Sequence, residues 1–148
     1  MMKLYCTQTA IEIPPPSQTV RWLSVDEFGV FQEHLKLCEQ HGCGEAKWKE
    51  AYWNGTVYCG LFVGEKMVSR ACVEKYSEKA WEVADVRTAK PYRGNGYALH
   101  VCAFVLQYIL AQGKMATIRT EDENASMKKV IEKLGFAERK TFPSQSTL

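Results

Sequence analysis

The stretch Arg93-Gly94-Asn95-Gly96-Tyr97-Ala98 decides how this chain of 148 residues is interpreted. It follows an apolar, strand-like segment over residues 83–88 and precedes a long apolar run typical of a buried helix. Two of its residues are glycines, so the backbone can take unusual angles there and the amides of successive residues can converge on one anion. The helix that follows adds unpaired N–H groups and the positive end of its dipole. The stretch therefore predicts a loop that binds a diphosphate.

The residues after the glycines exclude two other phosphate loops. The dinucleotide-binding fingerprint needs a third glycine where this chain has Leu99, and the P-loop needs Gly-Lys-Ser/Thr where it has Gly96-Tyr97-Ala98. The pattern that fits is Arg-x-x-Gly-x-Ala. By this pattern the chain resembles the GCN5-related N-acetyltransferase (GNAT) family, whose loop holds the pyrophosphate of acetyl-CoA.

A second segment strengthens the resemblance. Residues 124–136 begin with Asn124, a polar helix N-cap, carry apolar residues at helical spacing and end at Gly135-Phe136. The segment resembles the closing helix of the family and follows a predicted strand over residues 115–120, in the family's order. The resemblance covers about residues 56–142, and the N-terminal third only by analogy.

The remaining segments fit the same architecture. We expect a strand within residues 4–13, a proline linker, a strand over 20–24, helices from Ser24 or Asp26 to about 41 and over 46–52, and three antiparallel strands over 56–63, 67–75 and 81–88. The prediction is an α/β (α+β) GNAT-like acyl-CoA N-acyltransferase fold, with a central mixed sheet splayed in the middle and flanked by about four helices. One domain would span residues 1–148, with 1–18 as an extra N-terminal segment.

The short C-terminus departs from the family pattern. After a strand over residues 136–142 the family usually adds one more strand, and residues 143–148 are too short and polar to supply it. Unpaired sheet edges invite association. We therefore expect the N-terminal segment, or the second subunit of a homodimer, to cover the exposed edge.

Composition excludes several classes of protein. The net charge of +2 is scattered, so nothing demands nucleic acid. No apolar run approaches the roughly 20 residues of a membrane span, and the N-terminus lacks the core of a signal peptide. The six cysteines show no CxxC pairing, which favours reduced thiols over a disulfide framework. We expect a cytoplasmic protein.

Acetyl transfer to an amine requires a neutral amine and stabilisation of the developing charge on the thioester oxygen. A lysine-like amine with a pKa of about 10.4 is neutral in roughly one part in a thousand at pH 7, so a base is useful. Glu82 lies as far before Arg93 as the catalytic glutamate of the histone-acetylating members, which makes it the first candidate; a solvated strand-end charge is the alternative. Asp85 is the second candidate. Strand alternation places Asp85 on the face of the sheet opposite to Glu82. There it would contact the acceptor substrate or pair with Arg87.

The resemblance also implies contacts with acetyl-CoA. The backbone of Val86, Arg87 and Thr88 would pair with the pantetheine arm like an added strand. The pyrophosphate would bind backbone N–H groups of the loop at Arg93, Gly94, Asn95, Gly96, Tyr97 and Ala98. Asn124 would bond the pantetheine while capping its helix. Lys128 or Lys129 would meet the 3′-phosphate, with solvated helix charge as the alternative.

The chain lacks one catalytic group that many family members have. They carry a tyrosine five residues before the final Phe, where it protonates the departing thiolate, and this chain has Ile131. Solvent or another group would have to supply that proton. The absence leaves open a non-catalytic acyl-CoA sensor beside the preferred hypothesis, an N-acetyltransferase that acts on a primary amine of a small molecule or peptide by direct transfer in a ternary complex.

A third hypothesis is a zinc-stabilised binding module. His34, Cys38, His41 and Cys43 are soft ligands, three of them on one helical face. Consecutive turns of one helix do not easily place four ligands in a tetrahedron, and Cys38 continues an apolar stripe. We therefore predict no metal site.

Overall fold

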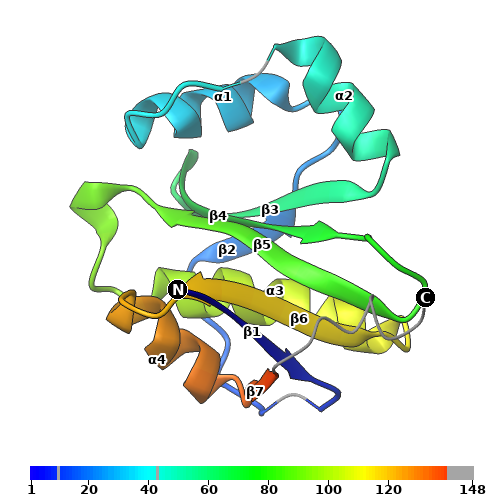
Figure 1. Cartoon of the computed structure of the whole chain (residues 1–148). Coiled ribbons are helices and arrows are strands. Elements are labelled where there is room, and N and C mark those ends of the chain that lie inside the picture. Colours follow the sequence, from blue (N-terminus) through cyan, green and yellow to red (C-terminus); the bar gives the residue numbers. More distant parts are fainter. Residues whose placement is uncertain (10, 43, 140–148) are drawn as a thin grey trace.

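The protein is described by a computed structural model in which residues 1–9, 11–42 and 44–139 are placed. Within these residues a seven-stranded sheet carries α1 and α2 on one face and α3 and α4 on the other (Figure 1). The elements in chain order are β1 (Met2–Thr7), β2 (Thr19–Trp22), α1 (Phe28–Leu37), α2 (Glu45–Trp53), β3 (Thr56–Val63), β4 (Lys66–Glu74), β5 (Ala80–Thr88), a 3₁₀ turn (Lys90–Tyr92), α3 (Tyr97–Ala111), β6 (Met115–Glu121), α4 (Ala125–Lys133) and β7 (Ala137–Arg139).

The sheet is mixed, as the sequence predicts. Its order is β2-β3-β4-β5-β6-β1-β7, and every neighbouring pair is antiparallel except β5 and β6. A parallel pair needs a long crossover, which α3 provides between β5 and β6. No helix of the described residues is long and apolar enough to cross a membrane.

The N-terminal segment fills a place inside the sheet. Strand β1 lies between β6 and β7, pairing Tyr5 with Ile118 on one side and with Glu138 on the other. The N-terminal segment therefore covers an edge of β6, as expected, and it does so from inside the sheet because β7 pairs with the other edge of β1. The missing strand therefore gives no argument for a second subunit, and the homodimer stays a prediction.

Two predicted boundaries need correction. The first helix was expected to reach about residue 41 and ends at Leu37, because Glu39 adopts a positive φ of 58° that a helix does not allow. The first strand was expected within residues 4–13 and instead spans Met2–Thr7, so it begins earlier and ends earlier than predicted. The expected strand over 136–142 begins as β7, and its residues 140–142 lie outside the described part of the chain.

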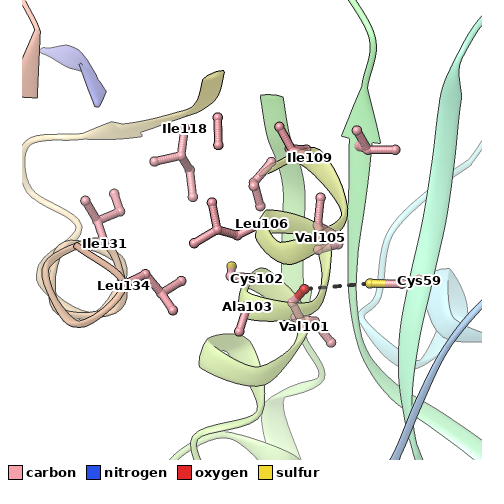
Figure 2. Packing of buried hydrophobic residues seen from close by; sticks show 14 of the residues in the cluster. Cys59, Val101, Cys102, Ala103, Val105, Leu106, Ile109, Ile118, Ile131 and Leu134 are labelled. Carbon is pink, nitrogen blue, oxygen red and sulfur yellow. Dashed lines mark hydrogen bonds between the residues drawn. The ribbon is translucent and has the colours of Figure 1, made fainter. Parts of the chain in front are cut away.

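Helix α3 is the centre of the main core. Its apolar side chains are buried against β3 to β6 and against α4, and Leu106 lies between Ile118 of β6 and Leu134 of α4 (Figure 2). The Sγ atom of Cys59 donates to the carbonyl of Val101 at 3.8 Å. Five cysteines of the described residues are buried free thiols, so they act as small apolar side chains.

The sheet opens between its two parallel strands. Strands β5 and β6 pair from Ala80 with Met115 to Val83 with Ile118 and no further, whereas β5 stays paired with β4 to Thr88. Within the described residues, the edge of β5 over 84–88 therefore has no strand partner on the β6 side. This is the predicted splay.

Candidate functional site

A cleft of about 790 Å³ lies beside the open edge of β5. The last residues of β5, the glycine loop, the start of α3 and one face of α4 form its walls. It collects all the predicted cofactor residues except Asn95, namely Val86, Arg87, Thr88, Arg93, Gly94, Gly96, Tyr97, Ala98 and Asn124. The side chain of Asn95 instead donates to the carbonyl of Tyr92 at 3.0 Å and so braces the loop.

The glycine loop has the backbone that the sequence indicates. Gly94 and Gly96 adopt φ values of 84° and 78°, which favour glycine. A Cβ at either position would meet no atom within 4 Å, so the backbone angle and not space selects glycine. Gly96 caps α3 without a side-chain hydrogen bond, which leaves first-turn N–H groups for a ligand. The Nε of Arg93 donates to the carbonyl of Thr88 at 2.9 Å and ties the loop to β5.

Helix α4 contributes more than Asn124. The Oδ1 of Asn124 accepts from the backbone N–H of Met127 at 3.1 Å, so Asn124 is an N-cap. Lys129 and Lys133 line the cleft, whereas the Nζ of Lys128 pairs with Asp122 at 3.1 Å and is not among the lining residues. Sequence reasoning missed Lys133, although its i, i+4 spacing from Lys129 places both lysines on one helix face.

Glu82 is buried, which overturns the alternative of a solvated strand-end charge. Its side chain accepts from the Nε of Arg119 at 2.9 Å and from the hydroxyl of Thr117 at 3.2 Å, and 8% of the residue is exposed. Burial raises the pKa of the Glu82 carboxyl, against the opposing effect of Arg119. A carboxyl with a raised pKa is suited to exchange protons nearer neutral pH. Glu82 does not itself line the cleft of 790 Å³.

The side chain of Asp85 does not follow strand alternation. Between Cys72, which pairs with Ala84, and Arg70, which pairs with Arg87, β5 carries two residues opposite one of β4. This β-bulge places Asp85 at a φ of 47° and turns its carboxylate to the α1 face, the face on which Glu82 also lies. The expected opposite placement was wrong for this reason. Its ion-pair partner is Arg70 and not Arg87, with Nη2 to Oδ1 at 3.0 Å.

A chain of polar groups runs from the bulge into the core under α1. Asp85 also accepts from the hydroxyl of Tyr58 at 2.6 Å, and the Nη1 of Arg70 lies 3.1 Å from the Nδ1 of His34. Burial and the charge of Arg70 lower the pKa of His34 to about 4. The imidazole is therefore neutral at pH 7 and can accept from the guanidinium.

The guanidinium beside His34 makes this position unfavourable for a zinc ion, although the neutral imidazole is the form that binds metals. A cation at His34 would face the guanidinium of Arg70, and the Nε2 of His34 lies 3.5 Å from the Sγ of Cys38. Among residues 1–9, 11–42 and 44–139 no group of three His, Cys, Asp or Glu side chains could hold a metal ion. Cys43, the fourth ligand of the zinc hypothesis, lies outside these residues.

The position of the family's tyrosine is part of the core. Ile131 is 2% exposed and packs in the main apolar cluster, and it is not among the residues that line the cleft.

Comparison with known structures finds the same fold. A GNAT acetyltransferase from Colwellia psychrerythraea has a TM-score of 0.73 at 17% identity, covering 93% of this chain and 52% of its own. A GCN5-related N-acetyltransferase-like protein from Streptococcus suis has a TM-score of 0.67 at 17% identity, covering 95% and 58%. An aminoglycoside acetyltransferase from an uncultured soil metagenomic sample, in complex with sisomicin, has a TM-score of 0.70 at 12% identity, covering 84% and 92%.

Several of these structures are longer than this chain, which spans between about half and three-fifths of their length. A search of curated protein sequences finds no match. The sequence model of the acetyltransferase (GNAT) family matches residues 18–136, so β1 lies before the matched region. With its splayed mixed sheet and left-handed glycine loop, the chain belongs to the GNAT acetyltransferase family.

Proposed function

We propose that this protein is an acetyl-CoA-dependent N-acetyltransferase that transfers the acetyl group directly to a primary amine of a small molecule or peptide in a ternary complex. One observation carries the proposal. A single cleft combines the open edge of β5, a loop with two left-handed glycines at a helix N-terminus, and the capped start of α4. Each part suits a different portion of acetyl-CoA.

The fit to acetyl-CoA follows from the chemistry of the walls. The open edge over residues 86–88 offers backbone donors and acceptors to the two amides of the pantetheine arm. The amides of residues 94–98 and the N-terminus of α3 suit the diphosphate. Lys129 and Lys133 supply positive charge on the same cleft for a further phosphate. Acetyl-CoA itself supplies the activated acyl group as a thioester.

Glu82 is the proposed base. It lies on the α1 face near the point where the strands separate, and burial raises its pKa, so it would hold a proton taken from the acceptor amine, directly or through water. Asp85, whose side chain is 41% exposed, is the second candidate on the same face. Ile131 supplies no acid, so solvent would protonate the departing thiolate, whose pKa is near the value of about 8.5 for a thiol.

The sensor hypothesis remains the second candidate function because of Ile131. A sensor keeps the cleft and lacks turnover, so binding and turnover must be measured separately. The acceptor panel should include aminoglycosides, since one structural neighbour is an aminoglycoside acetyltransferase. We expect the enzyme to act in the cytoplasm, where its buried free thiols stay reduced.

The test begins with calorimetric titration of acetyl-CoA into the full chain, followed by assays of thiol release with a panel of amines. The proposal predicts micromolar binding and amine-dependent release of CoA. If acetyl-CoA binds but no amine causes the release of CoA, the sensor hypothesis is favoured. If acetyl-CoA does not bind, both hypotheses are rejected.

Glu82→Gln then tests the base. This variant should lose most turnover and still bind CoA, whereas Glu78→Gln, at an exposed position before the same strand, should retain both. Unchanged turnover in Glu82→Gln would remove Glu82 from the mechanism.

A further inference from the structure

The bulge in β5 lies at the inner end of the proposed acetyl-CoA cleft. The glycine loop stands at one end of the open edge, and the edge closes at the pair of Val83 with Ile118. An arm that starts from a diphosphate at the loop and follows Thr88, Arg87 and Val86 must end beside the bulge, because β6 occupies the sheet beyond it. The acyl end of the cosubstrate therefore lies at Asp85 and Val86. This step rests on the proposed function.

The backbone at Asp85 is strained. A φ of 47° is unusual for a residue with a side chain, and such a conformation persists only when the surrounding structure holds it. Aspartate and asparagine tolerate this region better than other residues because their short polar side chains bond locally. Something in the structure must therefore over-determine the conformation.

Three side chains hold Asp85 at the bulge, directly or through one another. Arg70 binds both carboxylate oxygens of Asp85, with Nη2 to Oδ1 at 3.0 Å and Nη2 to Oδ2 at 3.1 Å. The hydroxyl of Tyr58 donates to Oδ2 at 2.6 Å. Arg70 is itself 2% exposed, and the remaining Nη1 meets the ring of neutral His34 at 3.1 Å. Burying a guanidinium costs desolvation free energy unless its N–H donors are paired. The burial of Arg70 therefore indicates that it positions its partner, Asp85.

A further contact, with an aromatic ring of α1, fixes the guanidinium of Arg70. The ring of Phe31 lies 5.6 Å from its Cζ atom, within the range of a cation–π contact. Both Phe31 and His34 belong to α1, so the orientation of Arg70 depends on the docking of that helix. The polar chain thus connects α1 to the backbone conformation of β5.

We propose that Arg70, fixed by His34, is a positioning residue: it holds Asp85 and thereby the left-handed bulge that binds the acyl end of acetyl-CoA. The ion pair between the buried guanidinium of Arg70 and the partly exposed carboxylate of Asp85 thereby has a function in binding the acetyl group. It predicts that loss of the pair changes recognition of the acetyl group and leaves recognition of the CoA body intact.

The test compares the affinities for acetyl-CoA and CoA by calorimetry. If the bulge contributes one net hydrogen bond to the acetyl group, the wild type binds acetyl-CoA about fivefold more tightly than CoA. Arg70→Met and Asp85→Ala should reduce this ratio to about one and keep the dissociation constant for CoA within about twofold of wild type. Asp85→Asn should keep most of the ratio, because asparagine tolerates the left-handed angle and still accepts from Tyr58.

The matched control is Arg21→Met. Arg21 also forms a two-point pair, with Glu27 at 2.9 and 2.8 Å, and lies 4.5 Å from the ring of Phe62, but it belongs to the edge strand β2 and does not line the cleft. It should leave the ratio unchanged.

Several results would refute the proposed positioning role of Arg70. It is overturned if Arg70→Met and Asp85→Ala keep the wild-type ratio, if CoA affinity falls in parallel with acetyl-CoA affinity, or if the wild type does not distinguish the two ligands. It is also overturned if Asp85→Asn loses the ratio as fully as Asp85→Ala, which would assign the effect to the charge. A wild-type protein that binds neither ligand would reject the proposed function instead.

Discussion

Protonation of His34 should destabilise the fold. The imidazole is 1% exposed and lies against the guanidinium of Arg70, with the carboxylate of Asp85 and the guanidinium of Arg87 also acting on it. Burial and Arg70 lower its pKa from 6.5 to about 4. The unfolded chain therefore takes up a proton at a higher pH than the folded chain does.

The size and direction of the effect follow from this difference. Because the pKa of His34 is lower in the folded chain than in the unfolded chain, the stability that the neutral imidazole contributes is fully present above about pH 6.5. This stability is lost as the pH falls towards 4. With one unit of pKa equal to 1.36 kcal/mol, the free energy of unfolding should drop by about 2.5 kcal/mol between pH 7.5 and 4.5, and by about 3.4 kcal/mol in total.

The assay is urea unfolding followed by tryptophan fluorescence across this range. His34→Asn removes the titration and keeps an acceptor near Nδ1 for Arg70, so it should lower stability by a constant amount and flatten the pH dependence. Carboxylates titrate in both proteins, and burial also lowers the pKa of His100, so the difference between wild type and variant is the quantity to compare. His41→Asn, on an exposed side chain, should keep the wild-type slope. The reasoning is refuted if His34→Asn and wild type lose stability in parallel.

Three further predictions concern the cleft. Gly96→Ala should weaken acetyl-CoA binding by about five- to thirtyfold, because an alanine at a φ of 78° costs about 1–2 kcal/mol; equal affinity by calorimetry would show that the loop angle is dispensable. Lys129→Ala should weaken the binding of CoA up to about fivefold and leave the binding of 3′-dephospho-CoA unaffected. Lys128→Ala should change neither affinity. Equal losses of CoA affinity in the two variants would reject the assignment of Lys129 to the 3′-phosphate. Asn124→Ala should cost about 1 kcal/mol of stability by loss of the cap to Met127, whereas Asn124→Asp should keep the cap and lose acetyl-CoA affinity if the amide donates to the pantetheine.

Local chemistry made part of this site predictable. The glycine loop and the cap at Asn124 depend on one or two residues and on helical spacing, so Gly94 and Gly96 are found where the sequence predicts them, with the expected left-handed backbone. The splay between β5 and β6 came from the family resemblance and is confirmed.

Long-range pairing accounts for what was missed. The bulge at Asp85 arises from its register against β4, which no spacing within β5 reveals, and the bulge in turn selects Arg70 as its partner. The burial of Glu82 likewise depends on Arg119, 37 residues further along the chain. The place of β1 inside the sheet depends on strands more than 100 residues away, so the sequence could indicate a missing strand and not where its replacement would lie.

A crystal structure of the full chain with CoA tests the central claim most directly. The account predicts the diphosphate on the amides of residues 94–98, the pantetheine along residues 86–88 of β5, and the thiol beside Asp85 at the closed end of the cleft. CoA bound elsewhere, or bound with its pantetheine away from the open edge of β5, would contradict it.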